Sequence, residues 1–305
     1  MRFGIALPSY GPLATADTLA RLARVAEDAG IDSVWVSDHL VAPVGSRTIY
    51  PYDRRPDAKP GDMGVIERFY EPMTTLAWLA GRTRRVRLGV SAWVLAYRNP
   101  VVAAKVAATL DDLSGGRLVL AVGTGWLREE FEAVGAPFAA RGARMEESLA
   151  IMGALWRGGE ARFDGRHHRL PPVRTGPLPV QRPRPPIWIA GNSAQALDRA
   201  ARLGDGWHAI DLAPDELAPR VAALRARLAA AGRPAAAVAV TLRKGVLVRD
   251  GATGRPLYGD HATIRRDLAA YRAAGLDYLV AGLRQAPSAD ALERALRETA
   301  EALGG

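Results

Sequence analysis

The strongest constraint on this 305-residue chain is a regular alternation of short apolar runs with longer helical segments. Runs of Val, Ile, Leu and Ala are expected to be strands, and the segments between them carry apolar residues at helical spacing. The expected strands are residues 2–7, 33–37, 86–94, 117–125, 186–191, 206–210, 238–248 and 277–283. The expected helices are residues 15–29, 71–83, 99–116, 141–156, 193–204, 214–231, 261–274 and 288–303.

Eight strand–helix units favour one fold class. Strands that alternate with helices pair in parallel, and eight such units in roughly 250 residues plus insertions fit a (β/α)8 barrel. The alternative, a doubly wound open sheet, requires a Gly-x-Gly-x-x-Gly turn after the first strand, and "PSYGPL" (8–13) is not one. We predict an α/β fold, a single TIM-barrel domain over residues 1–305. Two insertions are expected, at 38–69 after strand 2 and in an irregular stretch at 157–185 before strand 5.

Composition excludes several classes of protein. The chain has no cysteine, so disulfides, cysteine nucleophiles and thiolate metal sites are excluded. No apolar stretch reaches the roughly 18 residues that span a bilayer, so no membrane contact is expected and the prediction is a soluble, cytoplasmic protein. The net charge of +9 comes from scattered arginines without interleaved aromatics, which does not indicate nucleic-acid binding.

Candidate site residues lie where the barrel strands end, because barrel enzymes build their sites on that face. Small residues beside aromatic ones suit a flat conjugated ring, since glycines let the backbone approach it closely. No histidine–carboxylate cluster has metal-ligand spacing, so no metal is expected. No G-x-S-x-G motif follows a strand, so a serine hydrolase is not indicated. The collected residues are Asp38, His39, Ser91, Ala92, Trp93, Gly123, Thr124, Gly125, Trp126, Gly191, Asn192, Ser193, His208 and Lys244.

An anion site is predicted in "IAGNSAQAL" (189–197), where a strand and a Gly-Asn turn precede Ser193 at a helix start. Unpaired N–H groups and the helix dipole favour a phosphate there. Structural roles stay open beside the functional ones: Ser193 as an ordinary N-cap, His208 as a packing residue, and His39 as a histidine paired with Asp38. The functional interpretation is favoured because a barrel places these groups on one face.

Four stretches identify a resemblance. They are "MRFGIALPSYG" (1–11), "AEDAGIDSVWVSDHL" (26–40), residues 86–135 around "GVSAWV" and "GTGW", and "PIWIAGNSAQALDRAARLGDGW" (186–207). Together they resemble the luciferase-like flavin and deazaflavin oxidoreductases, the bacterial luciferase superfamily. The resemblance covers most of residues 1–208, and the rest of the chain matches by barrel rhythm only.

The resemblance implies a TIM barrel that binds coenzyme F420, a deazaflavin, or alternatively FMN. "SDH" with "GTGW" looks more like the F420-dependent branch. By this resemblance Asp38 and His39 lie beside the ring, and Ser91 and Ala92 form a bulge with a non-proline cis peptide. Sugar-phosphate dehydrogenases of this branch carry a glutamate where this chain has Trp126, so an acid is replaced by an apolar face.

The same resemblance implies the remaining contacts. Thr124 and Gly125 meet the ring's polyol side, while Gly191 and Asn192 meet the phosphate. Gly123 and Ser193 are expected to contact the cofactor as well, from their own places at a strand end and a helix start. Trp93, Trp126 and His208 are expected to contact the substrate. A homodimer is also implied, and a flavin or F420 reductase is the expected source of reductant.

The predicted reaction is hydride transfer between coenzyme F420 and a small, flat or apolar organic substrate. His39 is the expected proton donor or acceptor, since its ordinary pKa of about 6.5 suits both directions. Asp38 is expected to hold the His39 tautomer or to bond the cofactor. Two alternatives stay open: an FMN-dependent two-component monooxygenase, and a flavin-binding barrel without turnover. The aromatic loop "TIYPYDRRP" (48–56) is a candidate substrate contact.

Overall fold

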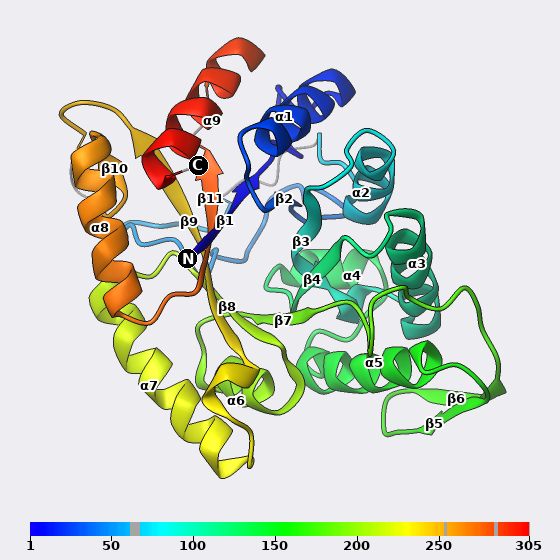
Figure 1. The fold of residues 1–305 in the computed structure, drawn as a ribbon. Coiled ribbons are helices and arrows are strands. Elements are labelled where there is room, and N and C mark those ends of the chain that lie inside the picture. Colours follow the sequence, from blue (N-terminus) through cyan, green and yellow to red (C-terminus); the bar gives the residue numbers. More distant parts are fainter. Residues whose placement is uncertain (62–67, 253–254, 284–285, 305) are drawn as a thin grey trace.

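The chain forms a closed parallel β-barrel inside a ring of helices (Figure 1). A computed structural model describes residues 1–61, 68–252, 255–283 and 286–304. Neighbouring barrel strands are parallel, and β8–β9 and β11–β1 pairing closes the ring. This confirms the predicted fold class. In spatial order the strands are β1 (Arg2–Ala6), β2 (Ser33–Val36), β3 (Arg87–Val94), β4 (Leu118–Gly123), β7 (Ile187–Ala190), β8 (Gly206–Ile210), β9 (Ala239–Val248) and β11 (Tyr278–Leu283).

Each of the predicted helices is present, with bounds within three residues of those expected. They are α1 (Ala16–Asp28), α2 (Pro72–Ala80), α3 (Pro100–Leu113), α5 (Arg141–Trp156), α6 (Ala194–Leu203), α7 (Pro214–Ala230), α8 (His261–Ala273) and α9 (Ala289–Leu303). Side-chain caps at Thr15, Glu71 and Asn99 bond the first backbone N–H groups of α1, α2 and α3, which explains where these helices start. Among the described residues, no helix is long and apolar enough to cross a membrane.

Two tryptophans fill the bore of the barrel. Trp35 on β2 stacks on Trp188 of β7, with ring centroids 4.9 Å apart, and both are buried. A Cβ at Gly89 would lie 2.3 Å from the Trp35 ring, and one at Gly206 would lie 2.5 Å from Trp188. Glycine at these two positions therefore makes room for the indoles, because real Cβ atoms do not approach so closely.

Several short elements lie outside the predicted pattern. They are η1 (Leu95–Tyr97), α4 (Arg128–Ala133), η2 (Ala235–Ala237), β10 (Tyr258–Gly259) and an antiparallel hairpin of β5 (Ala161–Asp164) and β6 (Arg169–Val173). The prediction that 157–185 is irregular is therefore wrong for the hairpin. Prolines 171 and 172 concealed β6, since proline is tolerated in strands that lie at a sheet edge, and both strands of a hairpin are edges.

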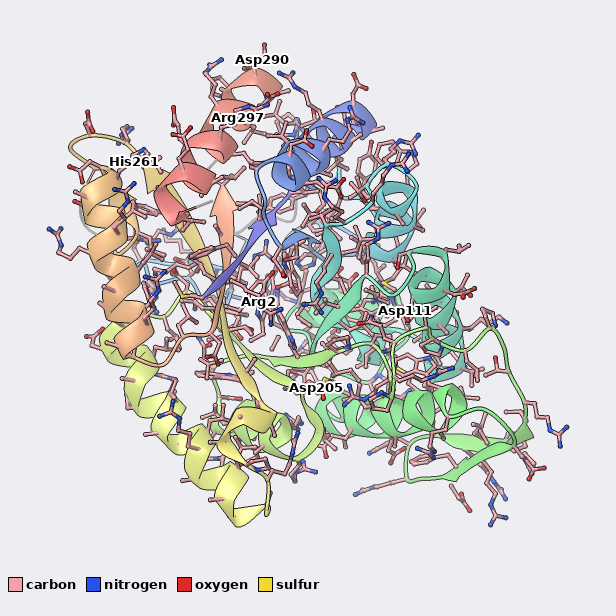
Figure 2. All side chains as sticks on the ribbon, in the orientation of Figure 1. Arg2, Asp111, Asp205, His261, Asp290 and Arg297 are labelled. Atoms are coloured by element: carbon pink, nitrogen blue, oxygen red, sulfur yellow. The ribbon has the colours of Figure 1, made fainter. Side chains whose placement is uncertain are left out.

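The end of the barrel where strands begin is tied by ion pairs and backbone hydrogen bonds. Figure 2 labels Arg2 and Asp205 at this end. Asp205 accepts from the Ile187 N–H at 2.8 Å and pairs with Arg184, so it joins the starts of β7 and β8. Arg2 of β1 likewise pairs with Asp32, just before β2, at 3.8 Å. The candidate site lies at the opposite end.

Candidate active site

The end of β3 forms a bulged platform. The peptide bond between Ser91 and Ala92 is cis, and the pairing of β3 with β4 shifts between Ser91 and Trp93. Both features were expected from the resemblance and are confirmed. Across from them, a Cβ at Gly123 would lie 3.0 Å from the Ala92 Cβ. Glycine at 123 therefore keeps the surface beside Ala92 flat, as contact with a ring requires.

Ser91 is held from below by a hydrogen-bonded chain. His208 Nε2 lies 2.8 Å from Ser91 Oγ, and His208 Nδ1 lies 2.7 Å from Thr241 Oγ1. The Thr241 hydroxyl donates to the Trp207 carbonyl, so Nδ1 must carry the proton and Nε2 accepts from Ser91. Burial, with a smaller contribution from Arg243, lowers the pKa of His208 to about 3. His208 is therefore a neutral imidazole.

Two predicted substrate contacts lie elsewhere. His208 is fully buried in the bore beside the stacked pair of Trp35 and Trp188, 5.7 Å from each ring, so its assignment to the substrate is wrong. Trp93 is 1 % exposed and packs into the core outside the barrel. The bulge after Ser91 explains this, because one extra residue turns the following side chains to the other face of the strand.

Asp38 has a different partner from the expected one. Its carboxylate accepts from both Arg98 Nη atoms at 2.7 and 2.8 Å and from the Val94 N–H at 2.9 Å. Burial is the largest single influence on the pKa of Arg98 and lowers it, but the charge and hydrogen bonds of Asp38, together with the charge of Glu71, outweigh burial and the pKa is raised. The expectation that Asp38 holds the His39 tautomer is wrong, because both oxygens of Asp38 are bonded to Arg98 and to the turn after β3. Contact between Asp38 and a cofactor stays a prediction.

The partner of His39 is Glu130, a residue that the sequence analysis did not select. Glu130 Oε2 lies 2.8 Å from His39 Nδ1 and accepts from the Tyr97 hydroxyl at 2.8 Å. Its other oxygen accepts from the Leu40 N–H at 2.6 Å and the Val41 N–H at 3.4 Å. Burial raises the pKa of Glu130, but the bonds from His39, Leu40 and Tyr97 outweigh it and the pKa is lowered. A fully buried carboxylate therefore lies at the mouth of the barrel, the end at which the strands finish.

The available signal for Glu130 was local. "LREEF" (127–131) places two acids between two apolar residues. The apolar residues, Leu127 and Phe131, are both fully buried. That spacing directs at least one acid toward the protein as a short helix forms. The expectation that Trp126 leaves the mouth without an acid was therefore incomplete, since the carboxylate enters four residues later.

Aromatic side chains surround His39. Its ring meets Phe69 and Trp126 edge-on, at centroid distances of 5.2 and 5.9 Å. Tyr10 stacks on Phe69 at 5.1 Å, and Tyr50 packs against Trp126 at 5.0 Å. The structure therefore brings His39 and Trp126 together as predicted, in a mouth with large apolar faces.

Residues 40–61, which we call the cover segment, run across this mouth. The Thr48 hydroxyl donates to Glu129 of α4 at 2.8 Å. At the far side Arg54 pairs with Glu216 of α7 at 2.9 Å. Burial raises the pKa of Tyr50 to about 12, so its hydroxyl stays protonated. The predicted insertion 38–69 thus covers the site, although its residues 62–67 lie outside the described part of the chain.

A pocket of about 290 Å³ opens between the ends of β4 and β7 and the cover segment. Its lining includes Thr124, Gly191, Ser193, Arg199 and Tyr52. Ser193 caps α6 by accepting from the Ala196 N–H at 3.2 Å, as expected. The first N–H groups of a helix have no intrahelical acceptor, so this end of α6 offers donors to an anion.

Asn192 contributes to this pocket in a narrower way than predicted. Its side-chain amide makes two bonds with the Ile210 backbone, through Nδ2 at 2.8 Å and Oδ1 at 3.0 Å. The side chain therefore joins the ends of β7 and β8 and is not directed at a phosphate. Its backbone, together with that of Gly191, remains part of the pocket wall.

The buried lysine of the candidate set is an ion-pair partner. Lys244 Nζ lies 2.8 Å from Asp211 Oδ1, and the Lys244 side chain is 5 % exposed. Arg54 reaches the same carboxylate from the cover segment. In the described part of the chain no group of three or more His, Cys, Asp or Glu residues could hold a metal ion.

With this geometry in hand, the chain can be compared with known proteins. Residues 1–254 match a family described as luciferase-like monooxygenase. An uncharacterized protein of Mycobacterium tuberculosis is 35 % identical over 212 residues, 70 % of this chain and 72 % of that protein. A phthiodiolone/phenolphthiodiolone dimycocerosates ketoreductase of Mycobacterium kansasii is 34 % identical over 242 residues, 75 % of this chain and 63 % of that protein.

Solved structures share the fold at lower identity. A monooxygenase from Streptomyces bottropensis has a TM-score of 0.82 and 22 % identity, covering 99 % of this chain and 98 % of its own. A coenzyme F420-dependent tetrahydromethanopterin reductase from Methanopyrus kandleri has a TM-score of 0.79 and 18 % identity, covering 98 % and 97 %. An F420-dependent secondary alcohol dehydrogenase, solved with an F420-acetone adduct, has a TM-score of 0.77 and 18 % identity, covering 100 % and 99 %.

Proposed function

Since this chain belongs to the luciferase-like monooxygenase family, we propose that it is an oxidoreductase that moves hydride between coenzyme F420 and a small, flat or apolar organic substrate. One observation carries the proposal. His39, an acid–base group with a buried carboxylate partner, lies among aromatic faces at the same end of the barrel as the flat platform of Ala92 and Gly123. Hydride transfer to a carbonyl or imine needs one such proton donor near the reacting atoms.

The residues at the barrel mouth fit a deazaflavin or flavin. The Ser91–Ala92 bulge and Gly123 would lie against the ring, and Thr124 and Gly125 against the polyol. Gly125 has φ +79°, and a Cβ there would lie 2.8 Å from both Phe131 and Val94, so only glycine fits the close turn. The pocket at α6 would take the phosphate, with Gly191 and Ser193 in its wall.

When bound, the reduced deazaflavin would supply a hydride to the substrate carbon. The carbonyl bond then needs a proton on oxygen, and His39 Nε2–H is placed to donate it. In the reverse direction Nε2 takes the proton from the alcohol as hydride leaves the carbon. The aromatic rim and the cover segment exclude water from this transfer, which strengthens each polar contact inside.

The substrate class follows from the mouth. Trp126, Tyr50 and Phe69 offer large faces with few polar atoms, and such surfaces bind planar or apolar molecules. A carbonyl or secondary alcohol is the favoured reacting group. Support comes from the ketoreductase relative and from the neighbour whose title names a secondary alcohol dehydrogenase.

A second candidate is an FMN-dependent monooxygenase supplied by a separate flavin reductase. The observation that favours it is the cover segment, which holds half-buried Tyr50 and Tyr52 over the site, since oxygen chemistry on a flavin needs a closed and dry pocket. The neighbour from Streptomyces bottropensis is itself a monooxygenase. A barrel that binds flavin without turnover is the non-enzyme alternative, and a homodimer stays a prediction from the resemblance.

A fluorescence titration of the purified protein with coenzyme F420 and, separately, with FMN tests the proposal. Micromolar or tighter F420 binding with much weaker FMN binding is expected. A screen of planar ketones and secondary alcohols with F420 should then show turnover at the deazaflavin absorbance band. Tight binding of FMN alone would favour the monooxygenase, with oxygen consumption as its assay. Binding of both without turnover would favour the non-enzyme alternative.

A further inference from the structure

We propose that Glu130 is a positioning residue that selects the ring nitrogen through which His39 acts and fastens the start of the cover segment to it. The consequence for catalysis rests on the proposed function, but the two positional claims do not. They rest on one buried carboxylate of α4 that accepts from donors in two other parts of the chain, the exit of β2 and η1.

The first step concerns the tautomer. A carboxylate only accepts hydrogen bonds, so the 2.8 Å contact requires His39 Nδ1 to carry a proton. In the neutral ring Nε2 then has a free lone pair, and in the protonated ring Nε2 becomes the donor. Glu130 therefore keeps Nδ1 in a hydrogen bond and leaves Nε2 as the nitrogen that exchanges a proton with substrate. A histidine with the opposite tautomer could not act as a base through Nε2.

The second step concerns the cover segment. Glu130 Oε1 accepts from the N–H groups of Leu40 and Val41, the first two residues of that segment. Because the Glu130 side chain is fully buried, removing its acceptor breaks both contacts at the start of the segment, and the N–H groups of Leu40 and Val41 must find other partners. The base of the cover segment and the orientation of His39 thus depend on the same group.

Glutamine distinguishes this arrangement from simple packing, because Gln has the shape of Glu but only one accepting end. In Glu130→Gln, the NH2 group must face either His39 and Tyr97 or Leu40 and Val41. In the first case Nδ1 must accept and the His39 tautomer reverses. In the second case the base of the cover segment loses its acceptor. Glu129→Gln is the matched control, since Glu129 is the adjacent residue and bonds the same segment at Arg47 and Thr48.

The experiment is ring 15N NMR of the full chain labelled at histidine, without cofactor. His39→Gln identifies the His39 signals, and His208 provides an internal example of the Nδ1–H tautomer. Wild type and Glu129→Gln are expected to show Nδ1–H for neutral His39. Glu130→Gln is expected to show the Nε2–H tautomer, or to keep Nδ1–H while proteolysis within residues 40–61 becomes at least several-fold faster.

Three results overturn the proposal. An Nε2–H tautomer in the wild type does so without any variant, so a Glu130→Gln chain that fails to fold leaves the test intact. An unchanged tautomer together with unchanged proteolysis in Glu130→Gln also does so. A His39 tautomer that reverses equally in Glu129→Gln and Glu130→Gln would show that Glu130 has no specific role in setting it.

Turnover separates this proposal from the proposed function. With F420 and an accepted substrate, Glu130→Gln should lower kcat about 10- to 100-fold with little change in KM, because it disturbs the proton step and not substrate binding. A reversed tautomer without any F420-dependent turnover in the wild type would remove the function and leave the positioning role. Loss of turnover with the tautomer and the cover segment unchanged would remove the positioning role alone.

Discussion

Two histidines of this barrel stand in contrasting surroundings. His208 lies in the bore, fully buried, with two hydroxyl groups as its partners and indole rings at its faces. His39 lies at the mouth, partly exposed, with a carboxylate as its partner. Burial with neutral partners keeps the His208 ring uncharged, whereas the carboxylate beside His39 accepts a hydrogen bond from a proton-bearing Nδ1 and leaves Nε2 for exchange. The contrast teaches that a place on or just after a barrel strand does not by itself make a histidine a proton-transfer group.

The same contrast holds for the regions around them. The bore is built by strands whose glycines admit two tryptophans, so its shape follows from interlocked side chains. The mouth is built by the cover segment and the short helix α4, held by individual hydrogen bonds. We therefore expect changes in the bore to act on global stability and changes in the mouth to act on chemistry and local opening.

The largest expected effect is on chemistry at the mouth. His39→Gln should lower turnover by about 10²- to 10⁴-fold, because general acid–base catalysis contributes that much, while the affinity for F420 changes only a few-fold. Steady-state kinetics and the fluorescence titration measure the two quantities. His167→Gln, on the hairpin connection between β5 and β6, is the control and should match the wild type. Full turnover in His39→Gln would remove the distinction drawn between the two histidines.

The next effect is on the bore. Gly89→Ala would place a Cβ 2.3 Å from the Trp35 ring, and the indole cannot move because it stacks on Trp188. Overpacking of this kind costs about 3 kcal/mol in the free energy of unfolding. Denaturant-induced unfolding measures it.

Gly153→Ala is the matched control for the bore. Gly153 lies inside α5, where a Cβ meets nothing within 4 Å, and alanine is better than glycine in a helix by about 0.5–1 kcal/mol. The control should therefore be stabilised. Equal stability of the two alanine variants would show that the bore tolerates more than its packing suggests.

The bore was more predictable from sequence than the mouth, for a physical reason. Strand and helix periodicity located each barrel element, because the pattern of buried and exposed positions that forms a strand or helix is visible in neighbouring residues of the sequence. The glycines at 123 and 125 and the cap at Ser193 were also found, since turns and caps restrict residue type. Bulges are not periodic, so the inward or outward direction of Trp93 could not be read from alternation.

The pairing at the mouth is long-range, which hid it. Glu130 meets His39 across 91 residues, and Asp38 meets Arg98 across 60. Adjacent residues such as Asp38 and His39 invite the assumption of contact, yet their side chains leave the strand in different directions. Only the folded structure shows which acid forms a hydrogen bond or ion pair with which base.

A third effect is the pH dependence of stability. The pKa of His208 is about 3 in the folded chain and about 6.5 when unfolded. Between these values the unfolded chain binds more protons, so stability falls as pH falls, by up to about 1.4 kcal/mol per pH unit. The loss between pH 7 and pH 5 should reach about 2 kcal/mol, above the range where most carboxylates titrate in the unfolded chain.

Unfolding measured at pH 7 and pH 5 checks this expectation. His208→Gln should be less stable at pH 7 and should lose less stability on acidification than the wild type. His261→Gln, on α8 away from the bore (Figure 2), serves as the control and should keep the wild-type slope. A wild-type slope in His208→Gln would place the acid sensitivity outside the bore.

The smallest effect concerns the middle of the cover segment. Thr48→Val removes the hydroxyl that donates to Glu129 at 2.8 Å and keeps the shape of the side chain. A hydrogen bond of this kind contributes about 0.5–1.5 kcal/mol, so the segment should open about two- to ten-fold more often. Limited proteolysis within residues 40–61 should accelerate by that factor, because cleavage follows the open population when opening is fast. Thr48→Ser keeps the donor and should cleave at the wild-type rate. Since the strands do not depend on this bond, the denaturant midpoint should stay unchanged, and a lowered midpoint would mean that mouth and bore unfold as one unit.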